Sequence, residues 1–458
     1  MNPEHTIEIG QRFPLTIKRL GINGEGIGYY KRTIVFVKGA LPEEEVVAEV
    51  TEIMPRFATA TIKKIRKPSK NRVTPPCEVY EACGGCQLQH LSYNKQLDFK
   101  RDMVLQSLEK FKPVGFEEFD IRPTIGMDDP WRYRNKAQFQ VRKNEDDKVI
   151  AGLYGEGSHK LVNIDNCLVQ RPETTKTVNI VKQLLSDLDI PIYDEVKHSG
   201  IIKTIVARVG IETGEVQLVL VTNSKKLPKK KQFLEQVKLQ LPEIVSIMQN
   251  VNQEKTSLVM GEETIHLAGK ESLTEKLDTL EFDLSARAFF QLNPIQTNVL
   301  YDEARKALDL QKDETLVDAY CGVGTIGLSL AKDAKEVRGM DTIPEAIADA
   351  KENAIKMGFD HVRYEVGKAE SLLPLWLKRG FKPDALVVDP PRTGLDPELI
   401  KAIVKAKPKK MVYISCNPST LGRDLEKLSR SYKVDYLQSV DMFPQTARCE
   451  VVVKLTAK

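Results

Sequence analysis

The sequence predicts a multidomain α/β protein that ends in a doubly wound parallel sheet of the Rossmann type. From about residue 281 onward, short apolar strands alternate with helical stretches, which is the pattern that predicts such a sheet. A glycine-rich loop at Gly322 follows the first of these strands. Before this region the apolar runs are mostly short and strand-like. For 458 residues we expect three domains: a β-barrel over 1–67, a mainly β central domain over 68–280, and the doubly wound domain over 281–458.

The N-terminal barrel is predicted from four short, half-apolar runs that are separated by turns. The runs are FPLTIKRL, TIVFVKG, EEVVAEVTEI and FATATIKKI. A closed barrel suits them because it leaves no long edge exposed. A basic stretch, 63–72, follows as a linker, and a second basic run, KKLPKKK, covers 225–231. Each run is either a solvated loop or a contact for a phosphate backbone, and no basic amphipathic helix points to a membrane surface instead.

Composition and cysteine use place bounds on the class of protein. Hydrophobic residues make up 41% and charged residues 29%, which is ordinary for a soluble globular protein. No apolar run approaches the roughly 20 residues of a membrane span, and the N-terminus lacks the pattern of a secretory signal. We therefore expect a cytoplasmic protein with no membrane partner. Its seven cysteines are an odd number, which favours metal ligands and catalytic thiols over disulfides.

The central domain opens with a cysteine-rich segment. Cys77, Cys83 and Cys86 form a C-x5-C-x2-C pattern, and Cys167 offers a fourth thiol from a distant segment. Four thiolates suit either a 4Fe–4S cluster or zinc, and the spacing alone leaves both open. After the cysteines, a stretch with helical periodicity covers 93–111, and from about 124 the pattern is mostly strands with one helix near 172–188.

A basic and aromatic alternation, WRYRNKAQFQV, lies at the start of the predicted central strands. Arg132, Arg134 and Lys136 alternate there with Trp131 and Tyr133, so a strand would place the two kinds of side chain on opposite faces. One interpretation is RNA binding, with cations on phosphates and aromatic rings on bases. The other is an ordinary strand with one solvated basic face.

The glycine loop of the C-terminal domain predicts a nucleoside-containing ligand. LVDAYCGVGTIG holds Gly322 and Gly324 in a G-x-G-x-x-G frame between a strand and a helix. Asp341 ends the next strand, where a carboxylate accepts hydrogen bonds from ribose hydroxyls. Asp318 and Tyr320 beside the loop suit a cationic ligand without phosphates, such as S-adenosylmethionine.

Two later strands end in residues that carry chemistry. Asp389 begins DPPRTG, and Cys416 lies in YISCNPSTLG, where a strand stops and a helix begins. Such a cysteine is either a small buried residue or a nucleophile, since a helix N-terminus lowers the pKa of a thiol.

These motifs together resemble the RNA 5-methyluridine, or uracil-C5, methyltransferases of the TrmA/RlmD family. The resemblance rests on FFQLNP, DAYCGVGTIG, DPPRTGL and SCNPSTLGRDL in this order and covers essentially the whole chain. It implies that the N-terminal barrel is a TRAM domain and that the four cysteines hold a 4Fe–4S cluster rather than zinc. Within the family, the chain is most similar to the dual-site 23S rRNA enzyme of Gram-positive bacteria.

The resemblance also implies roles for single residues. Cys416 would be the nucleophile that adds to carbon 6 of uracil, and Glu450 would take the proton from carbon 5. For the cofactor, the resemblance implies contacts from Gln291, Tyr320 and Asp341, with the loop glycines beside them. Asp389 would lie against both the cofactor and the target base. The expected partner is 23S rRNA or a large-subunit assembly intermediate, bound by a monomer.

Gln445 departs from the family pattern, because many members carry a histidine at this position. Three other functions remain open at this point. The first is methylation of the T-loop uridine of tRNA, and the second is methylation of carbon 5 of cytosine. The cytosine enzymes usually have a Pro-Cys nucleophile, whereas Ser415 precedes Cys416 here. The third is a non-catalytic RNA-binding or ribosome-assembly protein, against which the intact cofactor loop and thiol argue.

Overall fold

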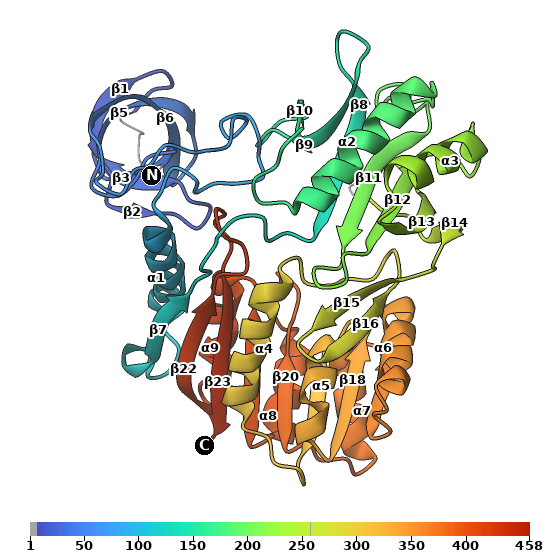
Figure 1. The fold of residues 1–458 in the computed structure, drawn as a ribbon. Helices are drawn as coiled ribbons and strands as arrows, with labels where there is room; N and C mark the ends of the chain where they lie inside the picture. The colour runs from blue at the N-terminus through green and yellow to red at the C-terminus, as the bar shows by residue number, and fades with distance from the viewer. Residues whose placement is uncertain (1–6, 257) are drawn as a thin grey trace.

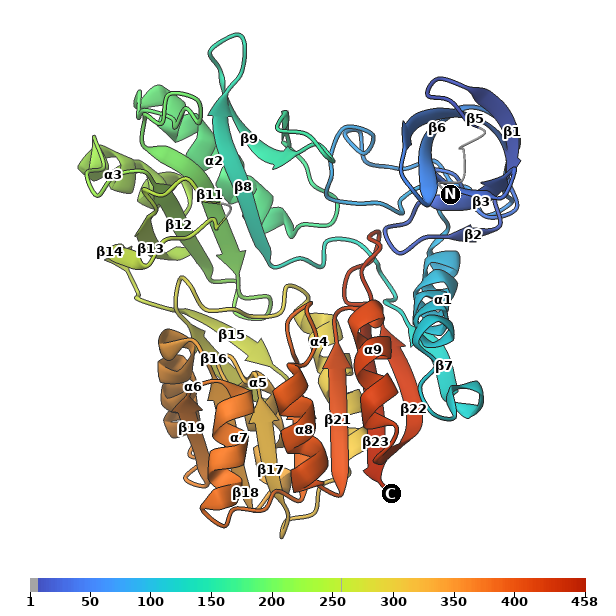
Figure 2. The ribbon, with the colours of Figure 1, turned by 180° about the vertical axis from the view of Figure 1, so that it is seen from behind.

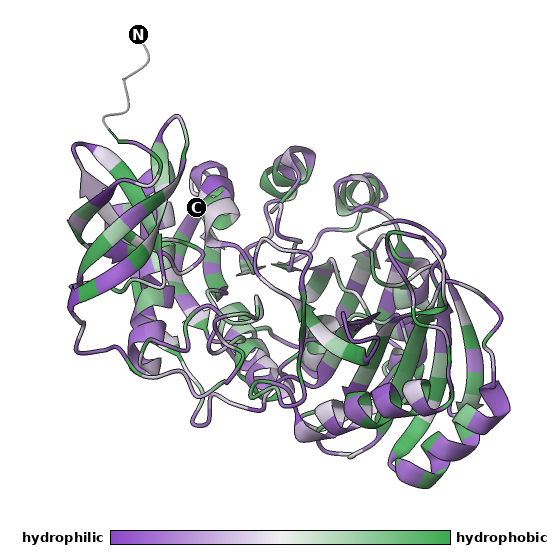
Figure 3. Cartoon of the chain, turned by 90° about the horizontal axis from the view of Figure 1, so that it is seen from above, coloured by the Kyte–Doolittle hydropathy of each residue, from purple (hydrophilic) through white to green (hydrophobic). Residues whose placement is uncertain are grey.

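The N-terminal strands form a barrel, as expected. The computed structural model describes residues 7–256 and 258–458, and its first six strands pair in the order β1-β5-β6-β4-β3-β2 and roll into a closed ring (Figure 1). Buried and exposed residues alternate along the strands, which Figure 3 shows as alternating bands of hydropathy. The strands are β1 Arg12–Thr16, β2 Arg19–Leu20, β3 Gly26–Tyr30, β4 Thr33–Lys38, β5 Glu45–Ile53 and β6 Phe57–Lys67.

The barrel is fastened to the rest of the chain by a buried ion pair, by the partly exposed pair of Arg19 with Asp102 at 2.8 Å, and by apolar packing. Glu44 is fully buried, and its carboxylate accepts hydrogen bonds from Arg72 at 2.7 and 2.8 Å. Leu20 and Leu41 of the barrel belong to the same hydrophobic core as Leu88, beyond the linker. The barrel is therefore packed against its neighbours rather than only tethered to them.

The central domain is built on one seven-stranded sheet. Its order is β10-β9-β8-β11-β12-β13-β14, and β12 and β13 are parallel while the other pairs are antiparallel. The strands are β8 Lys136–Lys143, β9 Val149–Tyr154, β10 Leu161–Asn163, β11 Ile202–Val209, β12 Val216–Thr222, β13 Ile244–Val251 and β14 Glu263–Gly269. Helix α2 (Pro172–Asp187) confirms the expected helix, whereas α3 (Lys230–Gln240) was not predicted. A crossover is needed there because β12 and β13 run parallel.

The C-terminal domain is the expected doubly wound sheet, extended by antiparallel strands at one side. Its order is β19-β18-β17-β20-β21-β23-β22-β7, and β17 to β21 are parallel. A hairpin, β15 (Leu273–Leu277) and β16 (Leu280–Leu284), leads into it. The strands are β17 Thr315–Ala319, β18 Glu336–Asp341, β19 Val362–Val366, β20 Ala385–Val388, β21 Lys410–Ser415, β22 Tyr432–Val440 and β23 Glu450–Ala457.

Helices cover both faces of this sheet. Helices α4, α5 and α6 lie on the face seen in Figure 1, and α7, α8 and α9 lie on the face seen in Figure 2. Each face has its own hydrophobic core. The helices are α4 Pro294–Leu308, α5 Thr325–Leu330, α6 Pro344–Lys356, α7 Ala369–Lys378, α8 Pro397–Ala406 and α9 Pro418–Leu428, with a short 3-10 turn, η2, at Ala331–Asp333.

One segment that the sequence assigned to the central domain packs with the C-terminal one. Helix α1 (Tyr93–Phe111) lies against α9, and β7 (Asp120–Ile125), after the 3-10 turn η1 (Phe116–Glu118), pairs in parallel with β22 at the sheet edge. The chain thus contributes β7 to the C-terminal sheet before it forms the strands of the central sheet. Among the residues described, no helix is long and apolar enough to span a bilayer.

Candidate active site

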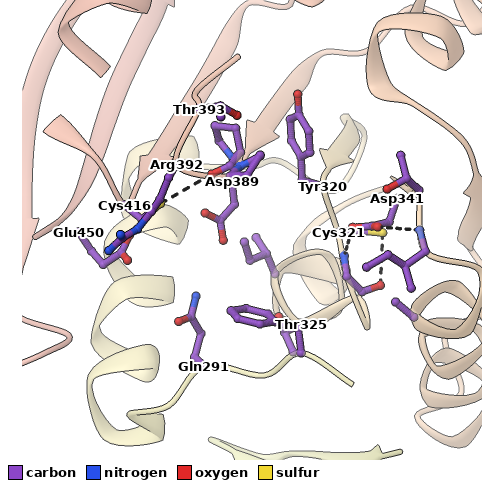
Figure 4. Close-up of a pocket in the computed structure, with 18 of the residues that line it drawn as sticks. Gln291, Tyr320, Cys321, Thr325, Asp341, Asp389, Arg392, Thr393, Cys416 and Glu450 are labelled. Carbon is purple, nitrogen blue, oxygen red and sulfur yellow. Dashed lines mark hydrogen bonds between the residues drawn. The ribbon is translucent and has the colours of Figure 1, made fainter. Parts of the chain in front are cut away.

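A single large cavity collects the predicted catalytic and cofactor residues. It encloses about 1290 Å³ and lies at the carboxyl ends of the parallel strands of the C-terminal sheet, where ligands bind in such folds. Figure 4 shows Cys416, Glu450 and Arg392 at one end and Asp341 at the other, with Asp389 between them. The central domain closes one side through Gly84, Gly85 and Arg134, among others.

The glycine loop after β17 forms the Asp341 end of the cavity. The carboxylate of Asp341 accepts hydrogen bonds from the backbone N–H groups of Gly322 and Ile343, each at 3.0 Å. Because a carboxylate offers about four lone-pair positions, it retains capacity for ligand hydroxyls. Gly324 has φ +84° and lies behind the loop, where a Cβ atom would stand 2.4 Å from the Tyr364 hydroxyl oxygen. The loop conformation therefore requires glycine at Gly324.

Asp318 supports the loop instead of facing the cavity. Its carboxylate is fully buried and accepts a hydrogen bond from the Gly327 N–H at 2.8 Å. Burial raises its pKa to about 8. Tyr320 and Gln291, by contrast, both line the cavity, one from the loop and the other from the segment before α4 (Figure 4).

Cys416 sits between the end of β21 and the start of α9. Asn417 caps this helix, since its side-chain oxygen accepts a hydrogen bond from the Ser419 N–H at 3.1 Å. The Asn417 amide also donates to the backbone carbonyl of Arg392 at 2.9 Å. The cysteine is thereby fixed against the DPPR segment, with its sulfur 4.0 Å from the carbonyl oxygen of Pro390.

The thiol of Cys416 is held in its neutral form, contrary to the sequence-based expectation. Burial is the main cause, and the nearby carboxyl groups of Glu450 and Asp389 add to it, so that the pKa rises to about 12. These effects outweigh the helix start and the positive charge of Arg392, which acts in the opposite direction.

Glu450 and Asp389 are two carboxyl groups in one poorly solvated space. Glu450 is 6% exposed, and burial followed by repulsion from Asp389 raises its pKa well above the usual range. Burial alone raises the pKa of Asp389 to about 7. Groups with such raised pKa values, gathered around a thiol in a cavity, are typical of acid–base and covalent catalysis.

The four predicted ligand cysteines surround a second, much smaller cavity. Cys77, Cys83, Cys86 and Cys167 all line it. A side chain at Gly84 would stand 3.0 Å from backbone atoms of Tyr154 and Glu156, so the glycine lets this segment pass close to β9. Among residues 7–256 and 258–458, no three His, Cys, Asp or Glu side chains are arranged to hold one metal ion. The four thiols are nevertheless gathered around one cavity.

Unpartnered polar atoms also face the thiol cavity. The side-chain oxygens of Gln89 and Gln170 and the Nε of Arg134 are buried without a hydrogen-bond partner among the described residues, and all three residues line the cavity. Burial raises the pKa of Cys86 to about 12, and it also raises the pKa of Cys167. Without a bound metal, these two thiols are therefore neutral. Metal-bound cysteines are deprotonated, and a positive group would remove this penalty.

Gln445, the position that departs from the family pattern, makes structural contacts. It is 3% exposed, and it exchanges two hydrogen bonds of 2.9 Å with Gln96 of α1. Its backbone carbonyl accepts hydrogen bonds from Gln87 and Leu88, just after the cysteine pattern. Gln445 therefore acts as a connection between the cysteine segment and the loop that leads to Glu450.

The predicted RNA-contacting residues divide into different environments. Arg132 is engaged internally, donating to the carbonyl of Cys167 at 2.6 Å and to Asn166. Tyr133 is 1% exposed and donates to the carbonyl of Pro444, so its ring is not available to stack on a base. Lys136 lies partly buried at the start of β8, and burial lowers its pKa to about 7. Arg134 lines the large cavity. The expected alternation of faces is seen in the burial, since Tyr133 is buried while Arg132, Arg134 and Lys136 are partly exposed, but the aromatic face packs inward instead of being open to bases.

The arrangement of fold, cavity and thiol agrees with known proteins. A family model described as tRNA (uracil-5-)-methyltransferase matches residues 92–458, and the TRAM domain model matches residues 7–63. The chain belongs to the RNA (uracil-5-)-methyltransferase family. It is 63% identical to an RNA methyltransferase of Enterococcus faecalis, over 99% of this chain and 100% of that one. It is 60% identical to one of Listeria monocytogenes, over 99% of both.

A solved structure shares the whole architecture. The tRNA (uracil-54, C5)-methyltransferase of Pyrococcus abyssi, in complex with S-adenosyl-L-homocysteine, has a TM-score of 0.76 and 30% identity, over 97% of this chain and 100% of that one. The expected order of TRAM domain, central β domain and Rossmann-like methyltransferase domain is thus confirmed, as is S-adenosylmethionine-dependent methylation of carbon 5 of uracil in RNA.

Proposed function

We propose that this enzyme methylates uridines of 23S rRNA through a covalent bond between Cys416 and carbon 6 of the base. The observation that supports the mechanism is the meeting of Cys416, Glu450 and Asp389 in one cavity with the glycine loop. A catalytic role fits this cavity better than passive RNA binding, because three ionisable groups with raised pKa values in a poorly solvated space are costly unless they act.

The steps follow from the chemistry of the residues. Cys416 gives its proton to the Asp389 carboxylate, which a pKa of about 7 leaves partly ionised at neutral pH, and its sulfur bonds to carbon 6, which turns carbon 5 into a nucleophile. S-Adenosylmethionine supplies the methyl group that carbon 5 takes up. Glu450 then removes the proton from carbon 5, the ring double bond re-forms, and the thiolate leaves. Because its pKa is raised, the Glu450 carboxylate is a stronger base than an exposed glutamate.

Two substitutions test the mechanism. Cys416→Ala removes the nucleophile, so we expect neither methylation nor a covalent complex with RNA. Glu450→Gln keeps the thiol but removes the base, so methyl transfer should proceed and the protein–RNA adduct should persist on a denaturing gel. Methylation by Cys416→Ala, or release of product by Glu450→Gln at the wild-type rate, would contradict the assignment.

Two RNAs, 23S rRNA and tRNA, are candidate substrates of this enzyme. The cysteine pattern supports 23S rRNA through its resemblance to the ribosomal branch of the family. The likeness to a structure titled as a tRNA (uracil-54, C5)-methyltransferase keeps tRNA as the second candidate. Labelled S-adenosylmethionine, offered with purified 23S rRNA and with purified tRNA that both lack the modification, decides between them. Label in tRNA alone would overturn the ribosomal assignment.

We also propose that Cys77, Cys83, Cys86 and Cys167 hold a 4Fe–4S cluster that links the cysteine segment to β9 and β10. The four thiols around one cavity and the unpartnered polar groups beside it support this. Protein purified without oxygen should contain four irons for each chain and absorb in the visible range, whereas zinc in place of iron would refute the cluster.

A further inference from the structure

Three arginine side chains without acidic partners line the active-site cavity. Arg134 comes from the segment before β8, Arg392 from the DPPR segment, and Arg448 from the loop before β23. Among the residues described, no carboxylate forms a salt bridge with any of them. Two other arginines of the same cavity differ in this respect. Arg423 pairs with Asp424 at 2.8 Å, and Arg287 pairs with Glu345 at 3.3 Å.

The three charges are close enough to act on one another. Burial, followed by the positive charges of Arg392 and Arg134, lowers the pKa of Arg448, while the nearby Cys416 acts in the opposite direction. A group of like charges is unfavourable in the free protein. It becomes favourable when an anion of several charges binds among them.

The position of the cluster indicates which anion this is. Arg392 points toward Cys416 and Glu450, at the end of the cavity opposite Asp341 and the glycine loop (Figure 4). Arg448 lies near both Arg392 and Cys416, so the arginines gather at the end of the cavity where the base must lie, not at the end predicted for the nucleoside of the cofactor. A uridine that enters this place has been extruded from its strand, and its two flanking phosphates accompany it. Guanidinium groups bind phosphate oxygens in a bidentate manner.

We propose that Arg134, Arg392 and Arg448 form a phosphate clamp that binds the RNA backbone on both sides of the target uridine and holds the base at Cys416. This inference rests on RNA uracil-C5 methylation as the reaction of the cavity. It assigns to these three residues positioning of the substrate, not bond making.

The clamp is tested by removing charge from both partners. Binding is measured with the shortest RNA hairpin, taken from 23S rRNA or tRNA, that the enzyme methylates. Arg392→Gln and Arg448→Gln should each weaken binding about tenfold or more and reduce the slope of log K against log salt concentration by about 0.7. A neutral methylphosphonate in place of a phosphate beside the uridine should weaken wild-type binding similarly. In the matching arginine variant the same replacement should have almost no further effect.

Arg430→Gln serves as the matched control. It removes the same charge just beyond the C-terminal end of α9, where Arg430 pairs with Glu426 outside the cavity. It should leave the affinity and the salt slope unchanged. Arg448→Lys, which keeps the charge but lacks the planar fork, should recover part of the affinity.

Two results would overturn the clamp. In the first, the losses of binding free energy caused by a methylphosphonate and by an arginine substitution add up at every phosphate position tried. This would mean that the arginines do not contact these phosphates. The other is that the variants keep the wild-type salt slope and change only the pH dependence of adduct formation, which would make the arginines modulators of the thiol. If no RNA is methylated at all, the function itself is wrong, which is a separate outcome.

Discussion

At the scale of single residues, the active site keeps ionisable groups in surroundings that disfavour their charges. The thiol of Cys416 and the carboxyl groups of Glu450 and Asp389 all have raised pKa values because they are buried close together. Such an arrangement lowers the stability of the free enzyme and is tolerated for the sake of function. The positive charge of Arg392 offsets only part of this effect at Cys416 and Glu450.

The cost of burying Asp389 should be visible as pH-dependent stability. The folded-state pKa of about 7 lies above the usual value of 3.8, so the folded protein binds more protons and loses stability as pH rises between these values. Asp389→Asn removes this loss. We expect the Asp389→Asn variant to melt at a higher temperature than wild type at about pH 8, and the difference to be smaller at about pH 5. Each kcal/mol of added unfolding free energy should raise the melting temperature by about 2–4 °C. Asp146→Asn, at an exposed site, is the control, and an equal gain at both pH values would contradict the assignment.

Gly324 permits a second test at this scale. Gly324→Ala combines a left-handed φ of +84° with a clash against Tyr364, whereas Gly380→Ala has φ +87° and nothing within 4 Å. Both variants bear the cost of the backbone conformation, but only the first displaces the loop. Calorimetry with S-adenosylhomocysteine should show affinity weakened about tenfold to a hundredfold for Gly324→Ala. Equal affinities of the two variants would mean that the loop adjusts freely.

The predicted site residues that the structure brings into the cavity lie in local motifs, where spacing alone fixes the neighbours. Gly322, Asp341 and Cys416 each lie at or just after the end of a strand, and the fold brings the ends of parallel strands together. Tyr133 was misread because its partner, Pro444, is more than 300 positions away. Arg448 carries no motif, and only the folded loop shows that it faces the cavity.

At the scale of elements, the turn between β21 and α9 joins the nucleophile to the DPPR segment. The side-chain oxygen of Asn417 caps the helix, and its side-chain nitrogen donates a hydrogen bond to the backbone carbonyl of Arg392. Helix α3 could not be predicted from the sequence. Its neighbouring lysines are typical of a loop, and Phe233 and Val237 are its only buried residues, which is too few to give a helical period.

The two functions of Asn417 should separate in a pair of variants. Asn417→Ala loses the cap and the link to Arg392, which should cost about 0.5–2 kcal/mol of stability. Asn417→Ser restores the cap but not the link, so its stability should return toward wild type. Because the DPPR segment is then less well held, both variants should form the adduct with 5-fluorouridine RNA about 10- to 100-fold more slowly. Stopped reactions on denaturing gels measure this, and a wild-type rate for Asn417→Ser would show that the link is dispensable.

At the scale of the whole molecule, distant parts of the chain share one active site. The cysteine segment bonds to the loop before Glu450 through Gln87 and Gln445, and Arg134 lines both the thiol cavity and the catalytic one. The domain order could be predicted from the rhythm of the strands. The placement of α1 and β7 in the C-terminal domain could not, because parallel pairing with β22 spans more than 300 residues of sequence.

The docking of the TRAM barrel depends on the buried pair of Glu44 and Arg72. Arg72→Ala leaves the Glu44 carboxylate, which has no exposed surface, without its cation, at a cost of about 3–5 kcal/mol. We expect the amides of β5 to exchange hydrogen about a hundredfold faster or more and the KM for RNA to rise, while affinity for S-adenosylhomocysteine stays near wild type. Arg12→Ala is the matched control, since Arg12 is 63% exposed in its pair with Glu49 and should cost less than about 1 kcal/mol. Equal exchange in the two variants would show that the apolar contacts of Leu20 and Leu41, with the Arg19–Asp102 pair, suffice to hold the barrel in place.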